Sequence, residues 1–319
     1  MPEPILVSLI VCSYKQEGYI EEAVLSALAQ TYDPLEIIIS DDCSPDRTFE
    51  IIQKTLFTHA GKRNITAYQN RTNLGLVGNL NTAFALAQGE LILVQGGDDC
   101  SLPDRTSELV AAYQSQQPKP DLVFSNVHFI DNKGKLLKTQ TEHRSIPTLE
   151  QVIRGRFFIA GGMAAAYSRD MLEFFGPLDR LILYEDYVLT FRALARNGIK
   201  HVPKPLVKYR IHDESIMAHE NAIAQDREKP TKILARSLAQ EDDRYSTWRK
   251  SGRTYIFDGW RLKRYRTYLV ADARSSTASR PQAMLWLLWA ILTMRPFFAR
   301  TIWSRDILRF QNSDSYTGA

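Results

Sequence analysis

Adjacent carboxylates follow two apolar runs of the sequence, and polar hydroxyl groups follow a third. The residues are Ser13-Tyr14, Asp41-Asp42 with Ser44 close behind, and Asp98-Asp99. Two neighbouring carboxylates in a loop suit a hard divalent cation, because proteins hold Mg²⁺ or Mn²⁺ with one or two carboxylates while substrate phosphates complete the shell. The pattern therefore predicts a diphosphate bridged by a metal ion, with Asp42 placed to hydrogen-bond a base or ribose.

The elements that would position these residues alternate between strands and helices over the first 130 residues. Short apolar, β-branched runs predict strands, and apolar residues at helical spacing predict the helices between them. We expect strands at 7–14, 35–42, 64–70, 89–99 and 121–131, and helices at 17–30, 46–56, 76–88 and 103–114. This alternation predicts an α/β fold with a mostly parallel sheet flanked by helices, and such sheets bind ligands beyond the carboxyl ends of their strands.

The segment from about 140 to 215 is less regular. It contains a Gly-rich stretch at 159–168, a helix at 185–198 and an extended stretch at 201–212. The prolines of the last stretch exclude a central strand, so we expect it at an edge of the sheet.

A simpler interpretation of the acids is that they only cap the helices that follow them. Asp46 and Asp104 lie nearer to the helix starts and suit that role better. The sequence contains neither GxGxxG nor GxxxxGK[ST], so neither a dinucleotide-binding loop nor a P-loop is supported. A ligand site at the carboxyl edge of the sheet is the favoured interpretation.

Four stretches carry a family resemblance through their order and spacing. They read SLIVCSYKQEGYIEEAVLSALAQTY, EIIISDDCSPDRT, NLGLVGNLNTAFALAQGELILVQGGDD and LYEDYVLTFRAL. Together they resemble the family 2 glycosyltransferases of GT-A fold, a Rossmann-like architecture, over roughly residues 5–215. The resemblance implies transfer of a sugar from a nucleoside diphosphate donor to an acceptor hydroxyl, with inversion at the anomeric carbon and with Mg²⁺ or Mn²⁺.

The resemblance also implies a donor site. The end of the first strand and the Asp-x-Ser of the second correspond to the nucleotide-binding residues Ser13, Tyr14, Asp42 and Ser44. The metal-binding Asp-x-Asp-Asp pattern corresponds to Gly96-Gly97-Asp98-Asp99, so a glycine replaces the first acid. We assign Asp98 as the direct metal ligand and Asp99 as its close support.

The Glu-Asp pair of the family matches Glu185-Asp186, and the Asp is the usual base. Inverting transfer needs one carboxylate to take the acceptor proton, so we assign Asp186 as base and Glu185 as the neighbour that orients it or the acceptor. The alternative is that both are acids favoured by the dipole at a helix N-terminus. The ordered set of motifs favours the catalytic interpretation.

Two further positions come from the late segment YRIHDES. It resembles the Arg-x-His segment of the family, which places Arg210 and His212 near the diphosphate or the metal. Surface charge and a packed histidine are the alternative. Gly161 and Gly162 allow a close approach of the backbone to a sugar, and a packing turn is an equally good interpretation.

The C-terminal part is basic and aromatic. Residues 244–310 hold fourteen Lys and Arg against three Asp, in a chain whose net charge is +4. Trp and Phe among arginines at 280–310 predict a peripheral contact with the cytoplasmic face of a membrane, and packing on the catalytic core or on a second subunit is the alternative. The apolar run 284–294 is too short to span a bilayer. No pattern of a nucleic-acid-binding module is present.

We therefore expect a catalytic domain at 1–215 and a helical extension at 216–319. The predicted protein is a cytoplasmic, metal-dependent inverting glycosyltransferase with a saccharide or lipid-linked acceptor, acting in surface polysaccharide or cell-wall assembly. Its oligomeric state is left open. One alternative is a sugar nucleotidyltransferase, but CSYKQEGY stands where its Gly-rich triphosphate loop would be. The other is a non-catalytic scaffold, which Gly96 supports and Glu185-Asp186 opposes.

Overall fold

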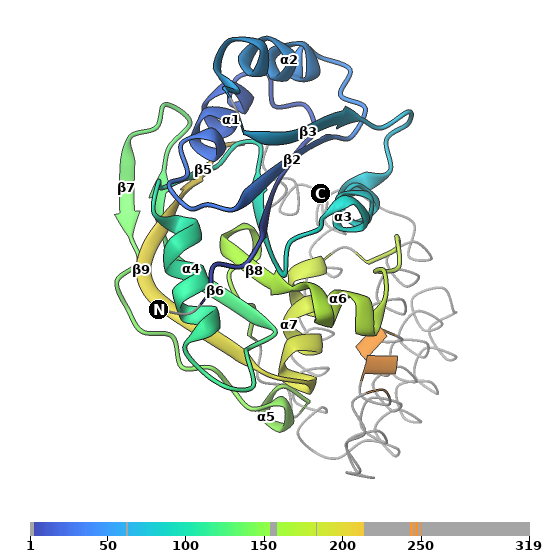
Figure 1. Ribbon diagram of the computed structural model, residues 1–319, viewed down its shortest axis with the longest axis vertical. Coiled ribbons are helices and arrows are strands. Elements are labelled where there is room, and N and C mark those ends of the chain that lie inside the picture. The colour runs from blue at the N-terminus through green and yellow to red at the C-terminus, as the bar shows by residue number, and fades with distance from the viewer. Residues whose placement is uncertain are drawn as a thin grey trace, which may run out of the picture.

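The computed structural model describes residues 3–61, 63–153, 158–182 and 184–213, together with 243, 244, 246, 247 and 250. Its centre is a nine-stranded sheet with the order β3-β2-β1-β4-β8-β6-β9-β5, and β7 pairs with β6 beside this path. Helices flank the sheet (Figure 1), which confirms the predicted α/β class. Of the predicted extension at 216–319, the structure describes only residues 243, 244, 246, 247 and 250.

The first half of the sheet is parallel. It consists of β1 (Val7–Ser13), β2 (Leu35–Asp41), β3 (Asn64–Gln69) and β4 (Leu91–Gly96). The register places Ser13 beside Asp41 and Cys12 beside Gly96. The ends of β1, β2 and β4 therefore lie together at one edge of the sheet, as the polar residues after each apolar run predict.

The second half of the sheet is mixed. Strand β6 (Leu122–Ile130) pairs antiparallel with β8 (Ala165–Ser168) and with β7 (Leu136–Thr139), and parallel with β9 (Ile199–Arg210). The edge position expected for 201–212 is wrong, because β9 lies between β6 and β5 (Cys100–Ser101). Its prolines are tolerated because the pairing of β6 with β9 shifts register around Asn126, and β5 pairs only with Val207 and Lys208.

The helices divide into two sets, one for each face of the sheet. Helices α1 (Ile20–Leu28), α2 (Thr48–His59) and α4 (Arg105–Gln114) contribute to one apolar core, and α3 (Gly75–Leu86), α6 (Arg169–Phe175) and α7 (Glu185–Ala195) contribute to the other. Successive residues of β1 alternate between the two cores, which explains its continuous apolar run.

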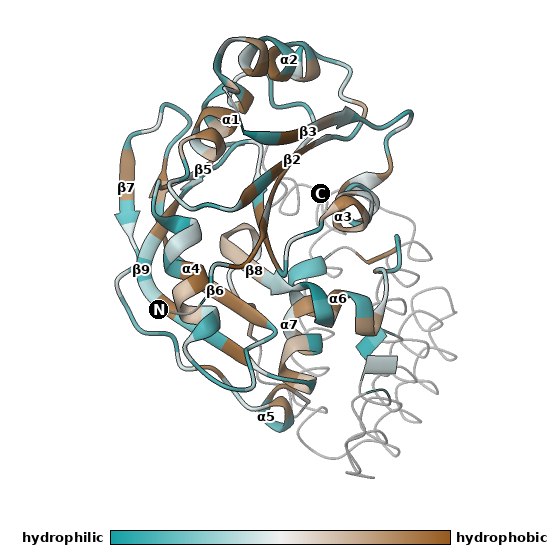
Figure 2. Ribbon diagram, in the orientation of Figure 1, coloured by the Kyte–Doolittle hydropathy of each residue, from teal (hydrophilic) through white to brown (hydrophobic). Residues whose placement is uncertain are grey.

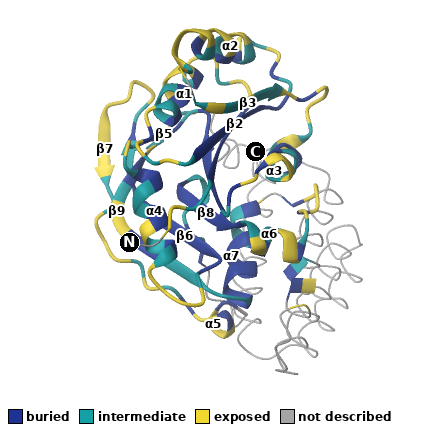
Figure 3. Cartoon of the chain, viewed as in Figure 1, coloured by how far each residue is buried: buried dark blue, intermediate teal, exposed yellow. Residues whose placement is uncertain are grey.

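The remaining helix, α5 (Leu149–Ile153), packs on α7. Figures 2 and 3 show the apolar, buried strands between the two layers. Within the described residues, no helix combines the length and the apolar character needed to cross a membrane.

Candidate active site

The acids predicted from three separate segments converge at the carboxyl edge of the sheet. Burial raises the pKa of the Cys12 thiol at the end of β1, and the charges of Glu185 and Asp42 raise it further. Burial also raises the pKa of Tyr209 near the end of β9, and so do the charges of Asp99, Asp98, Asp186 and Glu185. Glu185 of α7 raises the pKa of both groups. It therefore lies near the acid after β2 as well as the acids after β4.

Asp41, the last residue of β2, organises the first loop. Its carboxylate accepts hydrogen bonds from Ser13 Oγ at 3.1 Å, from the Ser44 amide at 2.9 Å and from Ser44 Oγ at 2.6 Å. Gln69 Nε2 donates a fourth at 2.9 Å. The predicted residues Ser13 and Ser44 are therefore brought together, with both hydroxyls turned to a fully buried carboxylate.

Asp42 lies beside Asp41 but faces another set of partners. Its Oδ1 accepts hydrogen bonds from Asn70 Nδ2 at 2.9 Å and from the Leu74 amide at 2.8 Å. The same Asn70 Nδ2 also donates to Asn79 Oδ1 at 2.9 Å, which links Asp42 to the buried side chain of Asn79. No hydrogen bond to Asp42 Oδ2 occurs among the described residues, so this oxygen is available to a ligand.

The loop after β1 presents an aromatic ring at the same edge. Tyr14 is 41% exposed, and the Lys15 ammonium lies 5.3 Å from the centroid of its ring. The Lys15 amide donates to Ser44 Oγ at 2.9 Å, which joins this loop to the loop after β2. An exposed aromatic ring at this edge is a suitable surface for a nucleotide base.

Cys43 adopts a left-handed backbone conformation with φ of 58°. This region costs a residue with a Cβ about 1–2 kcal/mol. We expect Cys43→Gly to raise the free energy of unfolding by about 1 kcal/mol, which corresponds to a melting temperature about 2–4 °C higher. Thermal unfolding with Cys43→Ala as the control checks this, because alanine removes the thiol and keeps the strain. An equal gain in both variants would assign the effect to the thiol instead.

The loop after β4 carries the predicted metal ligands. His212 Nε2 lies 2.9 Å from Asp98 Oδ2, and the Asp98 side chain remains 18% exposed. The Tyr19 ring packs on the imidazole, with the ring centroids 4.9 Å apart, while the buried Nδ1 of His212 has no hydrogen-bond partner among the described residues. Among the described residues as a whole, no three or more His, Cys, Asp or Glu side chains are grouped so that they could hold a metal ion.

Asp99 lies behind Asp98. Its carboxylate is buried and accepts a hydrogen bond from the Arg210 amide at 2.9 Å. Burial raises the pKa of Asp99 well above its ordinary value, and the adjacent charge of Asp98 raises it further. Asp99 thus contacts the backbone of β9 while Asp98 remains partly exposed, and the roles of both toward a metal stay predictions.

Gly96 occupies the position of the first acid in the family pattern. A Cβ at this position would lie 2.6 Å from Asp98 Oδ1 and 3.1 Å from Asp99 Oδ2. The Asp98 and Asp99 carboxylates thus fill the space that a side chain at position 96 would need. Both carboxylates thus lie next to position 96, where the family pattern has its first acid.

Arg210 joins this loop to its surroundings. Its Nε donates to the backbone oxygen of Asp98 at 2.9 Å, and its Nη2 donates to Glu22 at 2.5 Å. Its Nη1 donates to the backbone oxygens of Asp131 and Asn132 at 3.2 and 3.4 Å. The guanidinium is buried and occupied by protein oxygens, so a direct contact with a diphosphate would require these bonds to open. That contact stays a prediction.

Glu185 and Asp186 form the first turn of α7. Burial raises the pKa of Glu185 from 4.5 to about 8, and the charge of Asp186 adds to the effect. Asp186 is less buried, and its Oδ1 accepts a hydrogen bond from the Tyr187 amide at 2.8 Å. A Cβ on Gly162 would lie 3.2 Å from Asp186 Oδ2, so a glycine backbone passes beside this carboxylate. The raised pKa means that burial favours the protonated form of Glu185.

The raised pKa of Glu185 predicts a pH-dependent stability. The folded protein binds this proton more tightly than the unfolded chain, so the free energy of unfolding falls as pH rises from 4.5 to about 8. We expect Glu185→Gln to flatten this slope and to melt about 2–4 °C above the parent near pH 9. Melting curves across this pH range check the expectation, with the exposed Glu21→Gln in α1 as control. Parallel curves for Glu185→Gln and the parent would contradict it.

The sequence pattern included Asp41 without a role of its own and did not single out Asn70 or Asn79. Asp41 holds the loops after β1 and β2 together, and Asn70 donates both to Asp42 and to Asn79. A partner for a strand-end carboxylate can be named only when the register of the neighbouring strand is known. The roles of Gly161 and Gly162 toward a sugar stay predictions, although both have positive φ, 77° and 46°.

Comparison with known proteins identifies the family. The sequence profile of glycosyl transferase family 2 matches residues 8–176. An uncharacterized glycosyltransferase of Nostoc sp. is 26% identical over 238 residues, which are 72% of this chain and 71% of that protein. An uncharacterized glycosyltransferase of Methanocaldococcus jannaschii is 30% identical over 213 residues, 65% of this chain and 71% of that protein.

Solved structures share the fold. TarS 1–349 of S. aureus in complex with UDP-GlcNAc superimposes with a TM-score of 0.61 at 18% identity, over 88% of this chain and 78% of that chain. A mannosyltransferase of Pyrobaculum calidifontis in complex with GDP-Man and Mn²⁺ superimposes with a TM-score of 0.53 at 17% identity, over 99% and 89%. The family profile spans more than half of the sequence, and the chain is therefore a glycosyltransferase that belongs to glycosyl transferase family 2.

Proposed function

We propose that the protein transfers a sugar from a nucleoside diphosphate sugar to a hydroxyl of a saccharide or lipid-linked acceptor, with inversion at the anomeric carbon. One observation carries the proposal: the Asp98–His212 pair and the Glu185–Asp186 pair lie around the same edge of the sheet. Structural neighbours with UDP-GlcNAc, and with GDP-Man and Mn²⁺, support a donor of this class.

The donor nucleotide would lie on the loops after β1 and β2. The exposed ring of Tyr14 offers a stacking surface, and Asp42 Oδ2 is available to accept a hydrogen bond from the base or ribose. Ser13 and Ser44 fix these loops through Asp41. The resemblance implies that Ser13 and Ser44 also contact the nucleotide directly. Those contacts would come from the side of the two loops that faces away from Asp41.

The residues at the diphosphate position fit a divalent cation. Asp98 supplies a hard carboxylate oxygen of the kind that binds Mg²⁺ or Mn²⁺ when substrate phosphates complete the shell, and His212 lies beside that carboxylate. When bound, the cation would neutralise negative charge on the leaving diphosphate. Asp99 and Arg210 hold the Asp98 loop from behind.

Asp186 would accept the proton of the attacking hydroxyl. Its carboxylate is less buried than that of Glu185, whose pKa burial raises to about 8, and we therefore assign Asp186 as the base of the pair. Glu185 lies directly beside it and keeps the pair from carrying two buried charges. General base catalysis of this kind typically contributes about 10²–10⁴-fold to the rate.

A panel of UDP, GDP, dTDP and CMP sugars tests the proposal. The purified protein is incubated with each donor and with simple saccharide acceptors, in Mn²⁺ and in EDTA, and nucleotide release is followed together with the anomeric configuration of the product by NMR. Metal-dependent release with an inverted product is expected. A retained configuration would contradict the inverting mechanism, and no turnover with any donor would favour the scaffold alternative.

The biological setting is also part of the proposal. Acceptors in surface polysaccharide or cell-wall assembly are commonly lipid-linked, which would suit the peripheral membrane contact predicted for 280–310. That segment lies outside the described residues. The membrane contact, the cytoplasmic location and any oligomer stay predictions.

A further inference from the structure

Arg105, the first residue of α4, is a fully buried cation without an acidic partner. Its exposed fraction is 0%, and none of the ion pairs among the described residues involves it. Its Nε has no hydrogen-bond partner among the described residues either. Burial lowers the pKa of Arg105 to about 10, and the nearby charge of Asp99 opposes that effect, so the group stays charged at neutral pH. Burying a charge without a paired carboxylate is unfavourable for stability, which points to another use.

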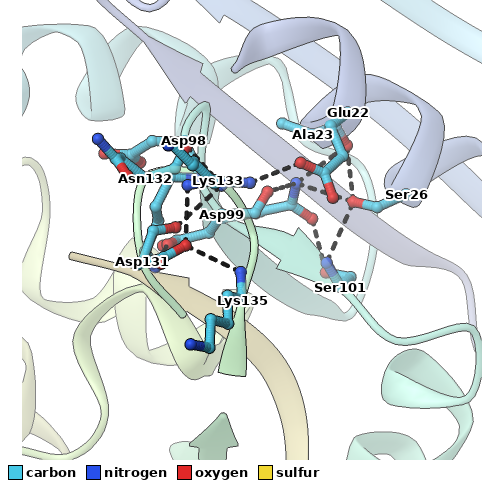
Figure 4. A network of polar contacts seen from close by, with 12 residues as sticks. Glu22, Ala23, Ser26, Asp98, Asp99, Ser101, Asp131, Asn132, Lys133 and Lys135 are labelled. Carbon is cyan, nitrogen blue, oxygen red and sulfur yellow. Dashed lines mark hydrogen bonds and ion pairs between the residues drawn. The ribbon is translucent and has the colours of Figure 1, made fainter. Parts of the chain in front are cut away.

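One side of the guanidinium holds the loop that carries Asp98. Nη1 donates to Ser101 Oγ at 2.8 Å, and Ser101 Oγ donates to Gln95 Oε1 at 2.6 Å. Gln95 Nε2 then donates to the backbone oxygen of Asp99 at 3.0 Å. Figure 4 shows this part of the network around Ser101 and Asp99. Nη2 also donates to the carbonyl oxygen of Val94 in β4 at 2.8 Å. Arg105 therefore bonds to residues on both sides of the Asp98 loop, Val94 before it and Ser101 after it.

The other contacts of the guanidinium reach the turn beside the proposed base. Nη2 donates to the carbonyl oxygen of Met163 at 3.1 Å and approaches that of Ala165 at 3.4 Å. Met163 belongs to the 3₁₀ turn Gly162–Ala164. Gly162 begins this turn, and its backbone passes Asp186 Oδ2 at close range. A single side chain therefore bonds to Val94 and Ser101, which flank the Asp98 loop, and to the turn next to Asp186.

We propose that Arg105 is a positioning residue for sugar transfer, which fixes the Asp98 loop relative to the Gly162 turn and thus to Asp186. This inference rests on the proposed function. Transfer needs the acceptor oxygen in line with the anomeric carbon and within reach of the base, and a misplacement of about 1 Å costs about 100-fold in rate. Among the described residues, the contacts of Arg210 and His212 hold the same loop from the end of β9, and none of them reaches the Gly162 turn.

The test compares Arg105→Lys with a matched buried arginine. Lysine keeps the charge but loses the planar fork that holds several oxygens at once. For Arg105→Lys we expect kcat to fall about 100-fold, with the donor KM and the calorimetric Kd for UDP or GDP with Mn²⁺ within about threefold of the parent. Arg192→Lys is the control, because Arg192 is equally buried but bonds Asp243 and the Gly176 carbonyl instead.

A second variant keeps the test independent of folding defects. Ser101→Ala retains the cation and removes the link to Gln95, and we expect kcat to fall about tenfold without a change in nucleotide binding. An unchanged kcat in Arg105→Lys would overturn the inference, and so would an equal fall in Arg192→Lys. If Arg105→Lys does not fold, the kcat of Ser101→Ala decides in the same way. A parent protein that turns over no nucleotide sugar would remove the proposed function, and this inference with it.

Discussion

Replacing Asp186 by Asn is expected to abolish sugar transfer while leaving the donor site intact. The amide cannot accept the proton of the acceptor hydroxyl, and it has nearly the same shape as the carboxylate. We expect kcat to fall about 10³-fold, and metal-dependent binding of the nucleotide to stay within about threefold, since Asp186 lies outside the Asp98–His212 pair. Steady-state turnover with the donor that the parent accepts, together with calorimetry of the nucleotide, measures both quantities.

Glu185→Gln is the matched control for this experiment. Glu185 is the adjacent acid of the same helix turn, and its pKa of about 8 makes it protonated at neutral pH. Glutamine reproduces a neutral side chain of similar size, so most of the activity near pH 7 should remain. Turnover in Asp186→Asn close to that of the parent, or an equal loss in both variants, would contradict the assignment of Asp186 as the base.

Replacing Asp98 by Asn is expected to remove the metal dependence of nucleotide binding. The substitution deletes the negative charge at the one carboxylate of this loop that faces the site, while His212 and Asp99 remain. Changes around metal ligands typically cost 10–100-fold in affinity, so loss of the ligand itself should weaken Mn²⁺-dependent binding of UDP or GDP by about 100-fold. Isothermal calorimetry with Mn²⁺ and with EDTA provides the comparison.

The control for Asp98 is a nearby acid outside the site. Asp131 accepts hydrogen bonds from the amides of Lys133 and Lys135 in the turn after β6, so Asp131→Asn changes charge close to the same network. We expect its nucleotide affinity to stay within about twofold of the parent. Unchanged metal-dependent binding in Asp98→Asn would refute the ligand assignment and would point to another group at the diphosphate.

The fold was largely predictable because its central strands are buried on both faces. Strands β1, β2 and β4 therefore appear as near-continuous apolar runs, and the polar residues that end them mark the edge at which the predicted site residues meet. Strand β8 was not predicted, since it is four residues long and consists mainly of small side chains. The central position of β9 was missed because its prolines exclude ordinary pairing, and the structure accommodates them with shifts of register.

The site was predictable as a set of residue types, and its internal contacts were not. Asp41 and Asp42 are adjacent and chemically identical, yet one holds the loop and the other leaves an oxygen for a ligand. Their difference depends on the registers of β2 with β1 and β3. His212 meets Asp98 across 114 positions of sequence, and that contact depends on the path of β9. Arg105 looked like an ordinary helix-start residue, since nothing in its local sequence shows that it is buried.

The central claim is that a nucleotide and a divalent metal bind together at the edge formed by Asp42, Asp98 and His212. Thermal shift of the purified chain against UDP, GDP, dTDP and CMP, each with Mn²⁺ and with EDTA, tests it most directly. We predict that one nucleotide raises the melting temperature in Mn²⁺ and not in EDTA, and that Asp98→Asn loses this shift. A folded sample that no nucleotide stabilises, or an equal shift in EDTA, would contradict the claim.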